Sequence, residues 1–247
     1  PVAAGRRLLY ETTERPVKEH FADLLLVAAD IGQLAGEDEG FFLDYLPRGQ
    51  ADAIRRNRRG EDRRRRLLVR ILLAFGLHLL TGNDARSTLA SLAREEDGRP
   101  VLRDSPWQIG FSHAAKWAVC VIGDGGVTGC VGVDIEEIRP VPVDDFHLVF
   151  AAAERKAIAA AADPSAELIR RCTIKEAVLK VRGKGFLEDP RQVNTDSPLD
   201  GGADLGCHWQ QVPVDEGYLL TIAARWRWQN LRMVRPLKEE WRPLFGA

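Results

Sequence analysis

Short apolar runs and alternating apolar and polar positions predict β-strands in three parts of the chain. Residues 22–31 (ADLLLVAADI) are almost continuously apolar, which is typical of a buried strand. Residues 117–122 and 127–135 predict a hairpin around the glycine-rich stretch 123–126. A second hairpin is expected from residues 206–212 and 217–228, across Asp215 and Glu216.

Helical periodicity fills much of the remaining chain. We expect helices over residues 37–46, 84–95 and 146–162, with Asp84 as an N-cap. The run 48–70 is rich in arginine and continues into an amphipathic helix with apolar side chains at positions 67–75. Residues 172–186 (CTIKEAVLKVRGKGF) carry apolar side chains at 174, 177, 178 and 181, the spacing of one helical face.

Composition is that of an ordinary globular protein with a sizeable core. The chain has 247 residues, is 45% hydrophobic and 29% charged, and has a formal net charge of −1, so no overall field attracts nucleic acid or membrane. The four cysteines form no CxxC pair, which argues against a zinc site or redox motif. The longest apolar run, 71–80, is too short to span a bilayer, and no signal pattern opens the sequence. We expect a soluble cytoplasmic protein.

The arginine run has two open interpretations. Residues 48–70 contain ten arginines against Asp52, Glu61 and Asp62. Such a run is often a solvated helix face. Alternatively it is a docking surface for phosphates, because the guanidinium group is always charged and binds phosphate oxygens in pairs.

Two acids share one face of a predicted strand at residues 131–137 (VGVDIEE). Asp134 and Glu136 are two residues apart, so both side chains project from the same side, whereas Glu137 points to the other. Adjacent carboxylates raise each other's pKa unless a cation lies between them. Oxygen ligands favour a hard cation, Mg²⁺ first and then Mn²⁺ or Ca²⁺. Taken alone, such a pair is more often a solvated strand end.

In the helix at 172–186, Thr173, Glu176 and Lys180 share a second face. Gly183 and Gly185 then end the helix. By itself, the pair Glu176 and Lys180 would be a surface ion pair of small energetic value.

The two stretches together resemble the Sfp-type (surfactin-synthetase-activating type) 4′-phosphopantetheinyl transferases. That family carries GVD-x-E, followed about forty residues later by W-(S/T/C)-x-K-E-(A/S)-x-x-K-x-x-G-x-G. Here the first motif is residues 132–136 and the second is residues 173–185, in the same order. Cys172 stands where the family usually has tryptophan, a departure that concerns local packing.

The resemblance implies an α+β fold of two similar halves, each a small, mainly antiparallel sheet packed against helices. The active site would lie in the cleft between them. We expect residues 1–105 to form the N-terminal half, on the 3′-phosphate and adenine side of coenzyme A. Residues 106–247 would form the half that carries the metal and the catalytic groups.

The resemblance also assigns candidate residues. Asp134, Glu136 and Glu176 would bind Mg²⁺ (Mn²⁺ is possible). Groups that bind coenzyme A are expected in the stretches 98–100 (GRP) and 110–113 (GFSH) and in the arginine run; the candidates are Arg48, Arg55, Arg99, Ser112, His113 and Lys180.

The catalytic candidates are Glu154, Lys180 and Glu176. Glu154 stands four residues after Phe150, where the family has an acid proposed as general base. It could equally be a solvated helix acid. Ser112 and His113 are not a hydrolase pair, because adjacent residues cannot readily place hydroxyl and imidazole in the required hydrogen bond and no G-x-S-x-G elbow is present.

The expected activity is that of a holo-[acyl-carrier-protein] synthase. The 4′-phosphopantetheine group of coenzyme A, the co-substrate, would pass to a serine of an apo acyl or peptidyl carrier protein, releasing adenosine 3′,5′-bisphosphate. Such an enzyme would be monomeric and would need neither nucleic acid nor membrane. Two alternatives stay open: a nucleic-acid-binding module that uses the arginine-rich helix, and a catalytically silent homologue that binds carrier proteins.

Overall fold

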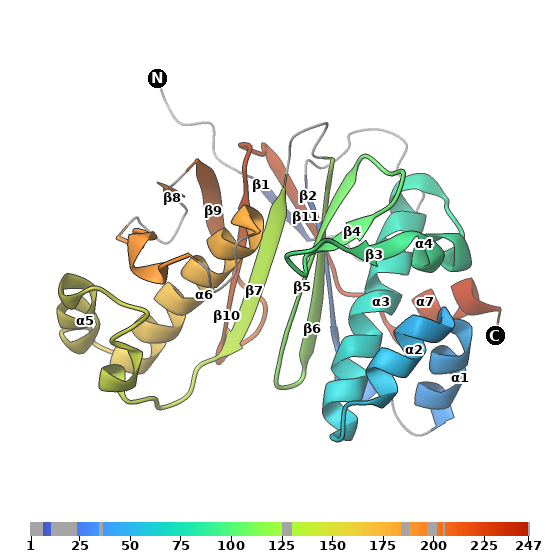
Figure 1. Cartoon of the computed structure of the whole chain (residues 1–247), viewed down its shortest axis with the longest axis horizontal. Helices are drawn as coiled ribbons and strands as arrows, with labels where there is room; N and C mark the ends of the chain where they lie inside the picture. Colours follow the sequence, from blue (N-terminus) through green and yellow to red (C-terminus); the bar gives the residue numbers. More distant parts are fainter. Residues whose placement is uncertain are drawn as a thin grey trace.

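Two β-sheets lie back to back in the middle of the molecule, with helices on both outer faces (Figure 1). The computed structural model describes residues 7–10, 24–34, 37–124, 130–183, 188–196, 202–204 and 206–246. The predicted α+β class with small sheets packed against helices is confirmed. The α-helices are α1 (Glu37–Tyr45), α2 (Arg48–Arg55), α3 (Gly60–Thr81), α4 (Ala85–Ser91), α5 (Ala152–Ala159), α6 (Pro164–Arg182) and α7 (Lys238–Trp241).

The larger sheet has five strands in the order β1-β11-β2-β6-β5. Its strands are β1 (Arg7–Tyr10), β2 (Leu24–Asp30), β5 (Trp107–Ala114), β6 (Trp117–Asp124) and β11 (Asn230–Val234). Strand β11 runs parallel to both β1 and β2, whereas β6 is antiparallel to its neighbours β2 and β5. The last strand of the chain therefore completes the sheet that the first strands begin.

The second sheet is antiparallel throughout, in the order β7-β10-β9-β8. Its strands are β7 (Val131–Glu137), β8 (Gly202–Asp204), β9 (Cys207–Val212) and β10 (Tyr218–Ala224). The predicted second hairpin is confirmed, because β9 pairs with β10 across Asp215 and Glu216. A small two-stranded hairpin, β3 (Leu92–Arg94) with β4 (Pro100–Leu102), stands apart from both sheets.

Strand β2 shows why the buried run at residues 22–31 has no alternation. Leu25 and Val27 face the helices α1, α3 and α7, whereas Leu24 and Leu26 face the second sheet. A strand covered on both faces must be apolar at every position. The inner face of the second sheet packs on the first, and its outer face is covered by α6.

The expected hairpin between residues 117–122 and 127–135 is wrong. Strand β6 pairs with β2 and β5, whereas β7 pairs with β10 in the other sheet. Both edges of β6 are occupied, and its true hairpin partner is β5, across Ala115 and Lys116. Ala115 adopts a φ of 43° without glycine or asparagine, so this turn gave no sequence signal. Residues 125–129, which include the end of the predicted turn and the start of the predicted second strand, lie outside the described residues.

Helix limits also differ from expectation. The helix expected at 84–95 ends at Ser91, although Asp84 caps it by accepting a bond of 2.9 Å from the Ser87 amide. Residues 146–162 form a shorter helix, α5, preceded by a 3₁₀ turn (Val143–Phe146). Helix α6 begins at Pro164, capped by Asp163, and ends at Gly183 with φ 70°. Gly185 lies outside the described residues.

The expected boundary at residue 105 does not separate the two sheets. Strands β5 and β6 follow it in sequence but belong to the five-stranded sheet, as does β11. After β11, Trp241 and Phe245 pack against Phe42 of α1. Asp38 of α1 pairs with Lys238 and Arg242 at 2.5 and 3.1 Å, which fastens the C-terminal segment to the first helix.

None of the described helices is by itself both long and apolar enough to cross a membrane. Helices α3 and α4 satisfy that criterion only when taken together across a 115° bend. The apolar side chains of α3 are buried in the core against β2 and β6.

Two glycines bring β5, β7 and α6 into close contact. A Cβ on Gly132 would lie 2.3 Å from the Ala177 carbonyl oxygen of α6. A Cβ on Gly110 of β5 would lie 3.2 Å from the Val131 carbonyl oxygen and 3.4 Å from the Cα of Gly132. These glycines let backbone pack on backbone where the two sheets and α6 meet.

We therefore expect Gly132→Ala to destabilise the protein by about 1–3 kcal/mol, the usual cost of overpacking a filled core. Chemical denaturation monitored by circular dichroism measures this change. The control is Gly40→Ala in α1, where a Cβ meets nothing within 4 Å and the helix should be slightly more stable. Equal stability of Gly132→Ala and the wild type would contradict the packing argument.

Candidate active site

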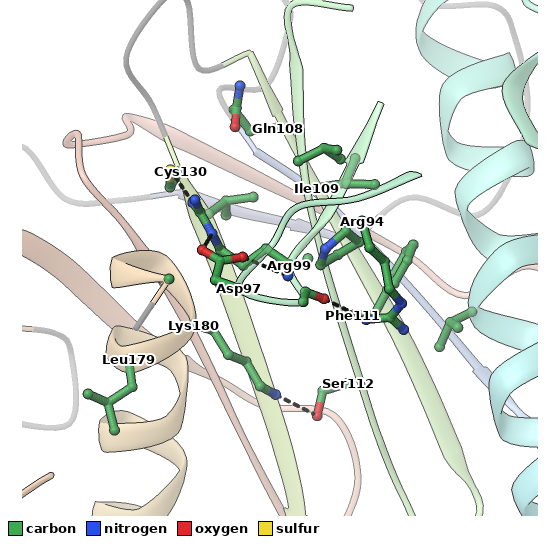
Figure 2. Close-up of a pocket in the computed structure, with 18 of the residues that line it drawn as sticks. Arg94, Asp97, Arg99, Gln108, Ile109, Phe111, Ser112, Cys130, Leu179 and Lys180 are labelled. Atoms are coloured by element: carbon green, nitrogen blue, oxygen red, sulfur yellow. Dashed lines mark hydrogen bonds and ion pairs between the residues drawn. The ribbon is translucent and has the colours of Figure 1, made fainter. Parts of the chain in front are cut away.

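A cavity of about 360 Å³ opens where β5, β7, the β3–β4 hairpin, α3 and α6 converge (Figure 2). Its lining includes Arg99, Ser112, His113 and Lys180, four of the residues that the sequence predicts. They come from three elements that are distant in the chain: the β3–β4 hairpin, β5 and α6. The structure thus brings the main predicted groups to one place, although it does not test their roles.

Lys180, Ser112 and Asp134 form a compact polar group at one wall of the cavity. The Lys180 ammonium donates to Asp134 Oδ1 at 2.7 Å and to the Val133 carbonyl at 2.9 Å. Ser112 donates to the same Asp134 oxygen at 3.0 Å and accepts from the Ile135 amide at 3.3 Å. Asp134 is buried, so this cation and hydroxyl stabilise its charge.

Glu136 and Glu176 share the electrostatic environment of Asp134. Burial, followed by repulsion from Asp134, raises the pKa of Glu136 to about 7, with a smaller contribution from Glu176. Burial and Asp134 also raise the pKa of Glu176. The positive charge of Lys180 is the largest effect that lowers the pKa values of Glu136 and Glu176. The carboxylates of Asp134, Glu136 and Glu176 therefore repel one another, and Lys180 offsets only part of that repulsion.

One carboxylate oxygen of Asp134 has no partner among the described residues. Asp134 Oδ2 is buried and has no hydrogen-bond partner in the structure. An orphaned carboxylate oxygen beside two acids of raised pKa fits a divalent cation. Within the described ranges, however, no three His, Cys, Asp or Glu side chains converge as a ligand cluster, and Asp134 Oδ1 is engaged by Lys180.

His113 lies between the acids and a group of arginines. Burial lowers its pKa below the usual value of 6.5, and Arg66, Arg65 and Lys180 add to the effect. A neutral imidazole at physiological pH can donate one hydrogen bond and accept another.

Arg99 stands at the tip of the β3–β4 hairpin. Its Nε donates to Asp97 at 2.6 Å and its Nη1 to Cys130 Sγ at 3.0 Å. In Figure 2, Asp97, Arg99 and Cys130 lie together above Lys180 and Ser112.

Three further arginines line the cavity and were missed as candidates: Arg66, Arg70 and Arg94. Arg70 donates to Gln50 and to the Arg66 carbonyl, and Arg94 to the Gly98 carbonyl. Within the described part of the chain, none of the three pairs with a carboxylate. Burial, then Arg94 and Arg66, lowers the pKa of Arg70 to about 10. The spacing of Arg66 and Arg70 by four residues was the available signal, since it places both on one helix face.

Arg48 and Arg55 do not line this cavity. Both belong to α2; the Arg48 side chain is 96% exposed, and Arg55 pairs with Asp44 at 2.7 Å. The sequence located the right arginine run but selected the wrong part of it for this pocket, because the register of the run depends on how α3 packs.

Comparison with known proteins identifies the chemistry of this region. Residues 130–224 match the family model of the 4′-phosphopantetheinyl transferase superfamily. The chain is also similar to 4′-phosphopantetheinyl transferase psf-1 of Bacillus pumilus, with 27% identity over 174 residues, which cover 66% of this chain and 72% of that protein. Both comparisons show that the chain is similar to 4′-phosphopantetheinyl transferases. The predicted resemblance is confirmed, and the general activity is transfer of phosphopantetheine.

The matched region forms one wall of this cavity. It contains the acids of β7 and α6 together with Lys180. The opposite wall, built from α3, the β3–β4 hairpin and β5, lies outside the matched region. The roles of Arg99, Ser112 and His113 therefore rest on the geometry of the cavity.

Glu154 is held in a buried network away from the cavity of the transferase. Its Oε1 accepts from Thr195 at 2.9 Å and pairs with Lys175 at 3.0 Å, while Oε2 accepts from the Ala151 amide at 2.9 Å. Arg171 lies 3.8 Å from the same Oε1. The geometry gives the general-base hypothesis no support, because both oxygens of Glu154 have structural partners.

The raised pKa of Glu136 predicts a pH-dependent stability. A folded-state pKa of about 7 against an ordinary 4.5 means that the folded state binds more protons in this interval, so stability falls as pH rises through it. In the absence of divalent cations, we expect Glu136→Gln to be more stable than the wild type at pH 8 and similar at pH 4.

Thermal unfolding at several pH values measures this difference. Glu137→Gln is the control, because Glu137 is exposed on the other side of β7. A wild-type melting temperature that rises in parallel with that of Glu136→Gln between pH 4 and 8 would contradict the assignment.

Proposed function

We propose that the protein transfers the 4′-phosphopantetheine group of coenzyme A to a serine of an apo acyl or peptidyl carrier protein. The reaction depends on Mg²⁺, with Mn²⁺ as a substitute, and releases adenosine 3′,5′-bisphosphate. The transferred group keeps one phosphate, and the bond broken is the one that joins the two phosphates of the coenzyme's diphosphate. The serine oxygen takes the place of the departing nucleotide phosphate.

The observation that carries this proposal is the charge pattern of the cavity. Arg66, Arg70 and Arg94 bring three positive charges into one pocket without carboxylate partners among the described residues. Placing like charges together is unfavourable unless an anion binds among them. Coenzyme A supplies such an anion, because its nucleotide end carries a 3′-phosphate and a diphosphate.

The residues that would hold Mg²⁺ are Asp134, Glu136 and Glu176. The raised pKa values of Glu136 and Glu176, together with the unpartnered Asp134 Oδ2, support this assignment. When bound, the cation supplies Lewis-acid stabilisation of negative charge on diphosphate oxygens.

The chain's own groups would orient the diphosphate between the acids and the arginines. Lys180 is half-buried at the boundary and provides a fixed positive charge. Ser112 is held by Asp134 and Ile135, so its hydroxyl has a defined direction. His113 can donate a hydrogen bond to a phosphate oxygen without adding a charge.

The alternatives gain no support. A nucleic-acid-binding module would show a steep salt dependence of affinity and no need for Asp134. A silent carrier-binding homologue is distinguished by the assay below. Monomeric state and cytoplasmic location stay predictions.

The experiment is a transfer assay with coenzyme A, Mg²⁺ and an apo carrier protein, followed by intact-mass spectrometry. We expect the carrier to gain one phosphopantetheine group. Glu176→Gln should fold normally and lose transfer, because a ligand loses its charge but keeps its shape. Glu137→Gln is the matched control and should remain active. Unchanged turnover of Glu176→Gln at saturating Mg²⁺ would remove this residue from the metal site, and an inactive wild type that still binds carrier would favour the silent homologue.

The arginine cluster generates a second expectation. Arg94→Ala should raise KM for coenzyme A roughly tenfold or more with little change in kcat, because charge-assisted bonds to phosphate hold the ground state and transition state alike. Arg48→Ala removes the same charge from an exposed position outside the cavity and should change KM less than about twofold. Steady-state kinetics decide, and equal effects in both variants would contradict the assignment of the pocket.

A further inference from the structure

An acid projects into a cavity whose neighbouring charges are mainly positive. Asp97 lies at the tip of the β3–β4 hairpin and lines the pocket together with Arg94 and Arg99 (Figure 2). A carboxylate in a site for a polyanion should repel the ligand. Its presence therefore needs a compensating role.

The contacts of Asp97 indicate that role. Its Oδ1 accepts from the Arg99 backbone amide at 2.9 Å, and its Oδ2 accepts from Arg99 Nε at 2.6 Å. Cys130 accepts from Nη1 at 3.0 Å. These contacts fix one edge of the guanidinium group, while Nη2 has no partner among the described residues. A long flexible side chain is thereby held in one orientation with donors remaining for a ligand.

The end of α6 confines this pair on its other side. A Cβ on Gly183 would lie 2.4 Å from Asp97 Oδ2 and 2.5 Å from Arg99 Nε, so only a glycine leaves room for the pair at this position. Gly183 has a φ of 70° and caps the helix three residues after Lys180. The hairpin tip therefore contacts the element that carries Lys180 and Glu176.

We propose that Asp97 is a positioning residue that orients Arg99 for the phosphates of coenzyme A. The benefit of a fixed guanidinium group exceeds the repulsion that the acid itself exerts on the ligand. This inference rests on the proposed function, and it extends that function to a residue outside the motifs and outside the matched region.

The direction in which KM for coenzyme A changes in Asp97→Ala shows whether Asp97 acts mainly by orienting Arg99 or by repelling the ligand. We expect Asp97→Ala to raise KM for coenzyme A about tenfold while kcat stays within about twofold, because an unheld arginine loses part of its charge-assisted binding. If repulsion dominates, KM falls instead. Glu96→Ala removes the same charge from the exposed side of the same hairpin and should leave KM within about twofold.

A double-mutant cycle shows whether Asp97 acts through Arg99. In the Arg99→Ala background, Asp97→Ala should change KM less than about twofold, since the group that it positions is absent. A merely structural role would give the same loss in both backgrounds. Asp97→Asn keeps an acceptor for the Arg99 amide and replaces the alanine variant if that variant does not fold.

Titration calorimetry of wild type with coenzyme A keeps the two proposals apart. A wild type that binds coenzyme A while Asp97→Ala binds equally well or better overturns the role of Asp97 alone. A wild type that neither binds nor consumes coenzyme A overturns the proposed function and this inference with it.

Discussion

The close approach of α6 to β7 at Gly132 is the constraint on which the site depends. With no side chain at this position, the helix backbone comes near enough for Lys180 to reach Asp134 Oδ1 and the Val133 carbonyl. Gly110 does the same for β5, which brings Ser112 to the same carboxylate. Any larger residue at 132 would displace the helix, and the acid of α6 would move away from the acids of β7.

Electrostatics divides the cavity into two walls. Burial and then repulsion from Asp134 raise the pKa values of Glu136 and Glu176, whereas burial and then Arg94 and Arg66 lower that of Arg70. On each wall, charges of the same sign repel one another. A ligand that carries phosphates beside a divalent cation would reduce the repulsion on both walls. His113 lines the same cavity, where burial first and then repulsion from Arg66, Arg65 and Lys180 lower its pKa.

Helix α6 both anchors the segment 188–196 and carries Glu176 of the acid group, with residues that are close in sequence. Lys175 is buried and donates to the Pro190 and Val193 carbonyls, and it pairs with Glu154. Arg171, one turn earlier, contacts Thr195 and Asp196. Glu176 projects from a different face, toward Asp134, because successive helical residues are about 100° apart. Thus the face that fixes the segment 188–196 also fixes the direction of Glu176.

The sequence by itself determined the local features whose cause is local. Alternation at residues 131–137 placed Asp134 and Glu136 on one side of a strand, helical spacing placed Glu176 and Lys180 together, and Asp84 marked a helix start. Tertiary structure alone decided which arginines face the cavity, that β6 pairs with β5 rather than β7, and that Glu154 meets Lys175. These outcomes depend on which faces of distant elements are buried together, and the periodicity of one segment carries no information about its partner.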